Sequence, residues 1–454
     1  MALSKGPLAR AEKIPRATLV LQTSKCIAAI DFGTSSLSVA YTTPTTRGDL
    51  QVLALHKPEV AAIAAQHQSE VKGLPPQRYM VVDIGGGTVD ITVHDKSNGG
   101  ISVVLPPMGN TWGGTTINEA LSMLLQEAVD DKGFVSFIKS DPISAKATLN
   151  KLFYEEFEKH KKVFGDTIVG LHEVVISLPS KLVQFYGSDK LHEANQVNMH
   201  YDPGDDSLTI GYSQLEEKVF QFTMDMIVEC VRAAFDELKP NGIDTVYLVG
   251  GFGGCKFVSQ RIEEAITQHC GILYDNIVCP VQPDLTVVSG AVMWRKDPNI
   301  IQSRVADATY GTGFAPVFNS SIHDEHYKFL NKEDGGQYCS YVFEVFVLKG
   351  DEIKDEVYKA RLIPLYQSTT QAHISIYCTG DDGVQYIKDK EGKPTVRKIG
   401  ELILDLPNPD NLPRTEKKFD VFMDFSGTEI QARARYSITG EEVKTVCDFL
   451  SNQD

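Results

Sequence analysis

The stretch Val81–Thr92 reads VVDIGGGTVDIT and carries the clearest structural signal in the sequence. Two short runs rich in β-branched residues, which favour strands, flank three consecutive glycines. Glycine weakens a strand because it loses more backbone entropy on folding than other residues do. The stretch also places Asp83 and Asp90 on either side of the glycines. It predicts two strands joined by a tight turn whose backbone N–H groups face a bound anion.

The same arrangement occurs a second time, nearer the start of the chain. CIAAIDFGTSSLSVAYT (26–42, the first hairpin) matches YMVVDIGGGTVDITVHD (79–95, the second hairpin). Three positions correspond between them: Asp31 and Asp83, Gly33 and Gly85, Ser36 and Thr88. Small turn residues leave the amides open to phosphate, whereas the aspartates suit a hydrated Mg²⁺ that bridges to the phosphates. The repeat therefore indicates two phosphate-binding turns.

A third glycine turn follows a predicted strand at 246–249, in the stretch TVYLVGGFGGCKFVSQRIEEAI. The turn (250–254) leads directly into a predicted helix, whose N-terminus could hold a nucleoside or a phosphate. Taken alone, such a turn is explained as well by close packing of the helix on the strand. Combined with two matching hairpins, it predicts a nucleotide site.

Composition narrows the classes of function. The 454 residues carry a formal net charge of −16, which argues against a broad nucleic-acid interface. The start of the chain has no apolar core of signal-peptide length, and no apolar run could span a membrane. We expect a cytoplasmic protein without membrane partners, with a transit peptide as the alternative for the basic start. The eight cysteines have no CxxC spacing and are predicted to be free thiols in a reducing compartment.

The three glycine stretches together resemble the phosphate-1, phosphate-2 and adenosine motifs of the actin, hexokinase and 70-kDa heat-shock ATPase fold. Three further stretches are similar to the heat-shock branch: GNTWGGTTINEAL (109–121), EEFEKHKKVFG (155–165) and CPVQPDLTVVSGAVMW (279–294). Others resemble the divergent heat shock 70 kDa protein 12 subgroup: SLPSKLVQFY (177–186), ATYGTG (308–313) and FDVFMDFSGTEIQARARYS (419–437). The resemblance covers Cys26 to about Cys447.

The resemblance implies a site for ATP or ADP with Mg²⁺. It makes three residues candidate catalytic groups: Asp83, Thr88 and Asp90. The candidate metal ligands are Asp31, Asp83 and Asp90. The candidate phosphate-site residues are Asp31, Gly33, Thr34, Ser35, Ser36, Gly85, Gly86, Gly87 and Thr88, joined by Gly113 and Gly114 of the stretch that follows.

The candidate adenosine-site residues are Glu158, Lys161, Lys162, Gly250, Gly251, Gly254 and Asp284. The first three lie at i, i+3 and i+4, on one face of a helix predicted over 145–164. Without the glycine turns, the ordinary interpretation of such a charge cluster is a solvated helix face.

One expected part of the fold is missing. In the family a whole subdomain separates the two phosphate hairpins, whereas here the loss falls between about Thr43 and Gln51. The family's phosphate-contacting lysine has no counterpart, and its glutamate near the attacking water aligns with Lys57, with Glu59 two residues further on. Losing one well-placed donor from such a site commonly costs about 10²–10³ in rate, so we expect weak or absent hydrolysis. Alternatively, Lys57 reaches the phosphates and partly substitutes.

The pattern changes after Trp294. Short alternating runs with turn signals predict an antiparallel sheet, as in a β-sandwich. RKDPNIIQSRVADAT (295–309) is predicted as a polar link, and EEVKTVCDFL (441–450) as a short final helix. We predict three divisions: a disordered tail (1–24), a truncated actin-like nucleotide-binding domain (25–296) and a β-sandwich-like C-terminal domain (297–454). The predicted fold class is thus an α/β actin-like ATPase fold with a truncated first lobe, followed by a mainly antiparallel β domain.

The leading hypothesis is a heat-shock-70-like, chaperone-like ATP/ADP-binding protein of the stress response, at most a weak ATPase. Its C-terminal domain would contact client or partner proteins. A nucleotide-independent scaffold or regulatory protein on the same fold is the main alternative. A small-molecule kinase would need a catalytic base from the mostly absent first lobe. Because that lobe is reduced, exposed strand edges around 26–41 predict self-association and lowered stability.

Overall fold

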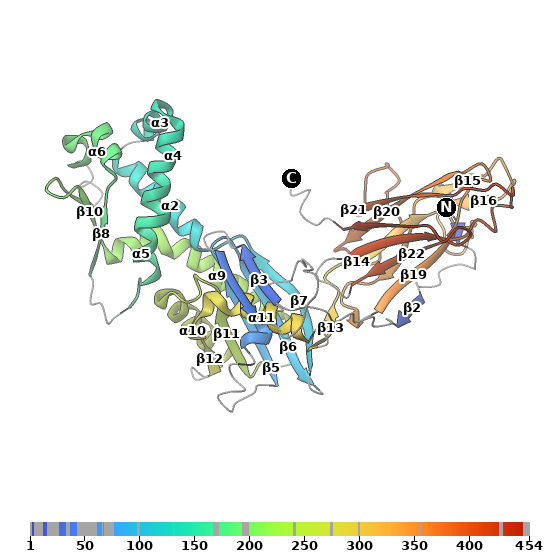
Figure 1. The fold of residues 1–454 in the computed structure, drawn as a ribbon, viewed down its shortest axis with the longest axis horizontal. Helices are drawn as coiled ribbons and strands as arrows, with labels where there is room; N and C mark the ends of the chain where they lie inside the picture. The colour runs from blue at the N-terminus through green and yellow to red at the C-terminus, as the bar shows by residue number, and fades with distance from the viewer. Residues whose placement is uncertain are drawn as a thin grey trace.

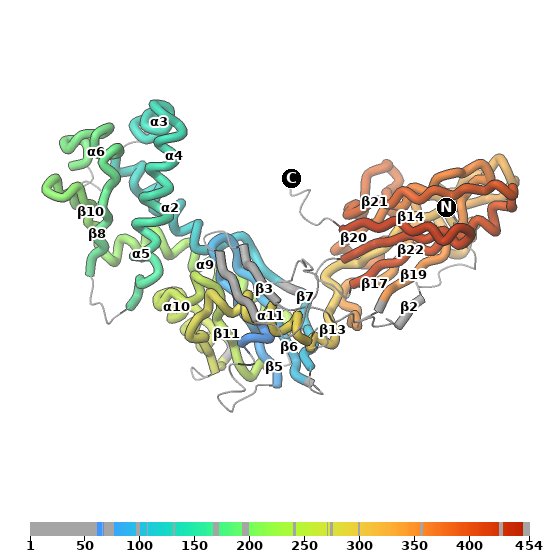
Figure 2. The backbone as a smooth tube through the Cα atoms, in the orientation of Figure 1, coloured from blue at the N-terminus to red at the C-terminus, as the bar shows by residue number. Residues whose placement is uncertain are grey.

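The computed structural model describes most of the chain from residue 77 onward. The described ranges are 77–97, 100–129, 131–166, 172–192, 199–238, 242–272, 276–297, 300–354, 356–425 and 430–447, with the shorter segments 2–3, 12–15, 27–32, 37–42, 61–65 and 67. Three parts follow one another along the long axis of the molecule: a mainly helical lobe, a central sheet with its helices, and a region of antiparallel sheets (Figures 1 and 2).

A seven-stranded mixed sheet forms the centre, in the order β12-β11-β5-β6-β7-β13-β18. Its strands are β5 (Arg78–Ile84), β6 (Val89–Ser97), β7 (Gly100–Asn110), β11 (Thr245–Val249), β12 (Ile277–Val278), β13 (Ile301–Val305) and β18 (Glu352–Lys354). The second hairpin is β5 and β6, paired antiparallel, and β11 runs parallel to β5. The strand before the third glycine turn therefore lies directly beside the second hairpin.

Helices cover both faces of this sheet. One face packs on α2 (Gly114–Val129), α9 (Gln221–Glu237) and α10 (Lys256–Cys270), through alternate strand residues such as Met80 and Val82. The other face, which includes Tyr79 and Val81, packs on α11 (Thr286–Lys296) and on residues 61–65. The alternation follows from the period of two in a strand, and both faces are buried because both are covered.

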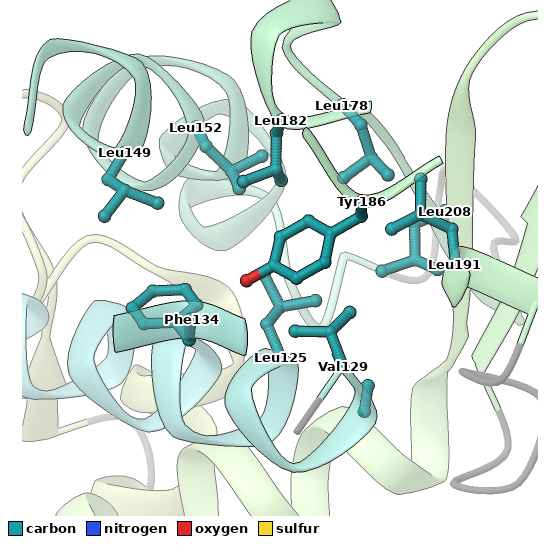
Figure 3. A pocket seen from close by; sticks show the side chains of 11 residues that line it. Leu125, Val129, Phe134, Leu149, Leu152, Leu178, Leu182, Tyr186, Leu191 and Leu208 are labelled. Atoms are coloured by element: carbon teal, nitrogen blue, oxygen red, sulfur yellow. The ribbon is translucent and has the colours of Figure 1, made fainter. Parts of the chain in front are cut away.

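The helical lobe is inserted between α2 and α9. Its elements are α3 (Asp131–Ser140), α4 (Pro142–Asn150), the π-helix η1 (Lys151–Glu156), α5 (Phe157–Lys162), β8 (Glu173–Ser177), α6 (Ser180–Tyr186), α7 (Ser188–His192), β9 (Met199–Asp202), β10 (Ser207–Gly211), α8 (Tyr212–Leu215) and the π-helix η3 (Glu216–Phe220). A cavity in the lobe is lined by apolar side chains, with the ring of Tyr186 among them (Figure 3). The helix predicted over 145–164 is thus α4, η1 and α5 in succession.

The first hairpin has a different setting from the second. Its strands β3 (Ile27–Phe32) and β4 (Leu37–Thr42) pair antiparallel with each other and form a two-stranded sheet of their own. Both strands lie against α11, and β4 also approaches the short 3₁₀ helix η5 (Pro283–Leu285). The first hairpin therefore lies on the face of the central sheet that α11 covers (Figure 1).

Two antiparallel sheets pack around one hydrophobic cluster in the C-terminal third. One sheet is β1-β19-β22-β23-β24, with β2 also on β19; the other is β17-β14-β20-β21. The strands are β1 (Ala2–Leu3), β2 (Glu12–Pro15), β14 (Thr309–Phe314), β17 (Val342–Val347), β19 (Glu356–Ile363), β20 (Gln371–Thr379), β21 (Arg397–Asp405), β22 (Phe419–Asp424), β23 (Gln431–Tyr436) and β24 (Glu442–Val446). A helical turn η7 (Glu325–Tyr327) precedes the small hairpin of β15 (Lys328–Leu330) and β16 (Gln337–Cys339).

Three local predictions differ from the structure. The predicted final helix at 441–450 is wrong, because β24 pairs with the edge of β23 and its β-branched Val443 and Thr445 suit a strand. The predicted polar link contains β13, which runs parallel to β7 in the central sheet. In the predicted tail, β1 and β2 pair with β19. The proposed domain boundaries stay predictions.

Candidate functional site

The turn of the second hairpin has two backbone N–H groups that make no hydrogen bond to the described residues. The amide of Gly85 bonds the Thr88 carbonyl at 2.9 Å and closes the turn. In the described part of the chain, the amides of Gly86 and Gly87 have no hydrogen-bond acceptor, and both residues are partly exposed. Adjacent free amides in a tight turn form the concave donor arrangement that binds anions.

The two aspartates of the hairpin belong to a row of four residues that crosses four strands. Val249 pairs with Asp83, Asp83 with Asp90, and Asp90 with Gly109. Directly paired residues point their side chains to the same face, so both carboxylates share the face that α11 and the first hairpin occupy. Asp83 is 6% exposed and Asp90 is partly exposed. The Thr88 hydroxyl donates to Asp90 Oδ2 at 3.0 Å.

The start of α2 is bonded to the turn of the second hairpin. The Gly114 amide donates to the Gly85 carbonyl at 3.1 Å, and the Thr115 amide donates to the Gly86 carbonyl at 2.6 Å. A Cβ atom at Gly113 would lie 2.7 Å from the Gly86 carbonyl oxygen. Only glycine at position 113 allows this approach. The predicted site residues Gly113 and Gly114 therefore hold the start of α2 against the turn of the second hairpin.

The third glycine turn is bonded to the end of β5. The amides of Phe252 and Gly253 both donate to the Ile84 carbonyl at 3.0 Å, and the Gly250 amide donates to the Pro283 carbonyl at 2.9 Å. Gly250 has a φ of +86°, and a Cβ atom there would lie 2.5 Å from the Ile84 carbonyl oxygen. The third turn is therefore held against the second hairpin by backbone contacts that need glycine.

Lys161 of α5 is buried beneath these two turns. Its side chain is 2% exposed, and its Nζ lies 2.8 Å from the Gly114 carbonyl oxygen, 3.1 Å from Asn118 Oδ1 and 2.6 Å from Glu158 Oε2. Burial lowers the pKa of Lys161, and the Glu158 carboxylate opposes that shift. Lys162, the next residue, is exposed.

A comparison of this chain with curated proteins finds relatives that share one family name. Human heat shock 70 kDa protein 12A is 28% identical over 385 residues, which cover 82% of this chain and 54% of the relative. Human heat shock 70 kDa protein 12B is 27% identical over 391 residues, covering 83% and 54%, and mouse heat shock 70 kDa protein 12A is 28% identical. The predicted resemblance to the heat shock 70 kDa protein 12 subgroup is confirmed.

The matched region covers only part of each relative. The chain spans about half the length of the curated relatives it matches (54%). A family profile described as a domain of unknown function (DUF8340) matches residues 74–276, from just before β5 to beyond α10. The mixed α/β fold is consistent with the heat-shock-70-like, actin-type fold.

The structure brings one group of the predicted residues together. The turn of the second hairpin, the start of α2 and the third glycine turn are joined by the hydrogen bonds above. Asp284 lies in η5 beside the third turn, where a Cβ atom at Gly251 would be 3.9 Å from the Asp284 Cβ atom. Glu158 and Lys161 reach this group from α5.

The remaining predicted site residues do not belong to this hydrogen-bonded group. Asp31 is in β3, directly opposite Ser38 of β4. Several lie outside the described residues: Gly33, Thr34, Ser35, Ser36, Lys57 and Glu59. The apolar cavity of the helical lobe contains none of the predicted site residues, so it is separate from the glycine turns (Figure 3).

Two residues beside the site were missed by sequence reasoning. Asn118 is 1% exposed and accepts from Lys161, although it reads in the sequence as an ordinary polar position of α2. Cys255 is 1% exposed, and its Sγ donates to the Lys161 carbonyl at 3.2 Å. Burial raises the pKa of Cys255 to about 11, so it is a structural thiol. The six cysteines that the structure describes are free, as predicted for those positions.

Proposed function

We propose that this chain is a heat-shock-70-like protein that binds ATP or ADP with Mg²⁺ and hydrolyses ATP weakly or not at all. The observation that carries the proposal is the second hairpin, where the free amides of Gly86 and Gly87 lie beside two carboxylates. The backbone bonds that hold the start of α2 and the third glycine turn against it support a preorganised phosphate site.

The residues at the hairpin also fit Mg²⁺. This ion usually keeps several waters and takes one or two carboxylates with the substrate phosphates. Asp83 and Asp90, opposite each other across the hairpin, provide that oxygen-only set, with Asp31 of the first hairpin as the proposed third group. Within the described ranges no cluster of three His, Cys, Asp or Glu residues that could hold a metal ion is found. The bound ion would neutralise phosphate charge.

The positions of the positively charged groups favour nucleotide binding over ATP hydrolysis. Lys161, the buried cation nearest the turn, is already engaged by protein oxygen atoms. The short connection between β4 and β5 supports a reduced first lobe, the part of the family fold that carries the phosphate lysine. Phosphoryl transfer depends on positioned charge around the transferred group, so we propose that bound ATP is hydrolysed slowly or not at all.

Calorimetric titration of the full chain with Mg-ATP and Mg-ADP tests this function. We expect binding by the parent protein, and a loss of about tenfold or more in affinity for Asp83→Ala, because a metal-bridging carboxylate is removed. Asp95→Asn is the matched control, since Asp95 lies at the opposite end of the same hairpin and pairs with Arg78 at 2.5 Å. Equal affinity in all three proteins would reject the metal role of Asp83, and absence of binding in the parent would reject the function.

A nucleotide-independent scaffold is the second candidate. The hydrogen bonds among the second hairpin, α2 and the third turn are complete within the protein, so this part of the fold needs no ligand to hold it together. The scaffold predicts the same thermal midpoint with and without Mg-ATP, whereas a nucleotide-binding protein is stabilised by its ligand through mass action.

We also propose contacts with other proteins. Among the described strands, β3 and β4 pair only with each other, so their outer edges offer backbone donors and acceptors to a second chain. Self-association through these edges would appear as a concentration-dependent sedimentation coefficient. The C-terminal sheets are the proposed surface for client or partner proteins. No helix of the described residues is long and apolar enough to span a membrane.

A further inference from the structure

The ammonium of Lys161 is enclosed by protein oxygen atoms. It donates to the Gly114 carbonyl at 2.8 Å and to Asn118 Oδ1 at 3.1 Å, and it forms an ion pair with Glu158 Oε2 at 2.6 Å. The side chain is 2% exposed, so a ribose or base could reach Nζ only by displacing these oxygen atoms. The phenyl ring of Phe252, in the third glycine turn, lies 5.7 Å from the same nitrogen.

The backbone of Lys161 makes a second connection. Its carbonyl accepts from the thiol of Cys255, the residue that caps the start of α10 directly after the third glycine turn. Three residues further along the chain, the Phe164 carbonyl accepts from the Phe257 amide at 3.0 Å. The end of α5 is therefore bonded to the third turn through its backbone, and to the start of α2 through the Lys161 side chain.

These contacts form a closed circuit through both turns. From Lys161 Nζ the circuit runs to Gly114, from the Gly114 amide to the Gly85 carbonyl, along the chain to the neighbouring Ile84, and from the Ile84 carbonyl to the third turn. The Cys255 thiol returns it to the Lys161 carbonyl. Lys161 joins the circuit through both its side chain and its backbone, and so connects the start of α2 with the start of α10.

We propose that Lys161 is a positioning residue, which fixes the phosphate-binding turn of the second hairpin relative to the third glycine turn and makes no contact with the nucleotide. The inference deepens the proposed nucleotide site and rests on it for its functional meaning. Of the two lysines predicted to contact adenosine, the exposed Lys162 then remains a candidate.

The atoms that surround the Lys161 side chain explain why a lysine is suited to this position. Burying an ammonium is costly unless it is paired and fully hydrogen-bonded, and Glu158 supplies the opposite charge. A compact ammonium can direct separate donors to three converging oxygen atoms, whereas the planar guanidinium of arginine presents its donors in a flat fork. Methionine at this position would fill a similar volume without donating to the Gly114 carbonyl.

Hydrogen exchange without any nucleotide tests the positioning role directly. The comparison is between Lys161→Met and the matched control Lys162→Met, which removes the adjacent exposed lysine. We expect the amides of Gly114 and Thr115, which bond the turn carbonyls, to exchange about tenfold faster in Lys161→Met, because a charged hydrogen bond that anchors the start of α2 is lost. In Lys162→Met their exchange should equal that of the parent. Parent-like exchange in Lys161→Met would overturn the proposal.

Binding measurements separate a positioning residue from a ligand contact. Lys161→Met should weaken Mg-ADP binding by about tenfold and leave adenosine binding unchanged, since the phosphate turn is what moves. An equal loss for adenosine and Mg-ADP, with parent-like exchange, would assign Lys161 to the adenosine and overturn the proposal. If the parent binds no nucleotide, the proposed function fails, but the exchange comparison still decides the positioning role.

A second variant covers the case in which Lys161→Met does not fold. Lys161→Arg keeps the charge next to Glu158 and changes only the geometry of the donors. It should accelerate exchange at the same two amides by a smaller factor, and unchanged exchange in this variant would also count against the positioning role.

Discussion

The two hairpins have nearly the same sequence pattern and very different surroundings. The second hairpin lies inside a seven-stranded sheet, with β11 on one side, β7 on the other, and backbone bonds to α2 and the third glycine turn. The first hairpin forms a two-stranded sheet that lies against α11 and η5. Both carry an aspartate as the second-last residue of their first strand, yet among the described strands only the second hairpin has neighbours on both sides.

The difference teaches that a glycine motif specifies a local turn but leaves its rigidity to the surrounding fold. At the second hairpin, backbone hydrogen bonds to α2 and to the third glycine turn hold the turn in place without a ligand. The first hairpin is held by its own strand pairing and lies against α11. If a nucleotide bridges both hairpins, as proposed, the half of its site at the second hairpin is preorganised by backbone hydrogen bonds.

The largest effect expected at the second hairpin comes from Gly250→Ala. Gly250 has a φ of +86°, and its added Cβ would lie 2.5 Å from the Ile84 carbonyl oxygen. We expect a loss of about 3 kcal/mol or more in the free energy of unfolding, measured by urea denaturation, because backbone strain and a clash with main chain combine.

Gly271→Ala is the matched control for that substitution. Gly271 has a φ of +68° at the end of α10, but nothing lies within 4 Å of an added Cβ. It should cost about 1 kcal/mol, the cost of the left-handed conformation alone. Equal losses in the two variants would mean that close approach to the second hairpin contributes nothing, and the contrast between the hairpins would lose its main support.

Hydrogen exchange along the two hairpins gives the next largest contrast. Amides of β5 should exchange at least about a hundredfold more slowly than those of β3 in the nucleotide-free protein, because a strand inside a sheet opens only with its neighbours. Mg-ADP should slow exchange in β3 and β4 more than in β5 and β6. If β3 and β5 exchanged at equal rates without nucleotide, the inferred difference in rigidity between the two hairpins would be contradicted.

Much of the central sheet was predictable from local sequence. The strands and turn of the second hairpin follow from β-branched runs around glycines, and the third turn follows from its strand-to-helix glycines. Their adjacency was implied only by the family resemblance, since strand order depends on long-range pairing. Long-range pairing also determines the structure of the last strand. A helix was predicted for EEVKTVCDFL, but β24 forms there because it pairs with the edge of β23.

The role of Lys161 shows what sequence could not reveal about the site. Its spacing from Glu158 predicts one helical face, and the structure confirms that the two side chains meet at 2.6 Å. Which side of α5 is buried depends on α2 and the third turn, which are distant in the chain. The π-helical segment η1 just before α5 adds a local change of helical register that the spacing rule does not include.

The smallest effect comes from two adjacent glycines behind the second hairpin. A Cβ atom at Gly113 would meet the Gly86 and Gly85 carbonyl oxygens at 2.7 and 2.9 Å, whereas one at Gly114 would meet the end of the Lys161 side chain at 3.2 Å. Gly113→Ala should therefore destabilise by about 2 kcal/mol, because main chain must move. Gly114→Ala should cost less, about 1 kcal/mol, because the held Lys161 ammonium must shift while no main chain has to move, and the helix propensity of alanine offsets part of the cost. Urea denaturation of both variants measures the difference. If Gly113→Ala were as stable as Gly114→Ala, the turn could yield without cost, and the second hairpin would be no more fixed than the first.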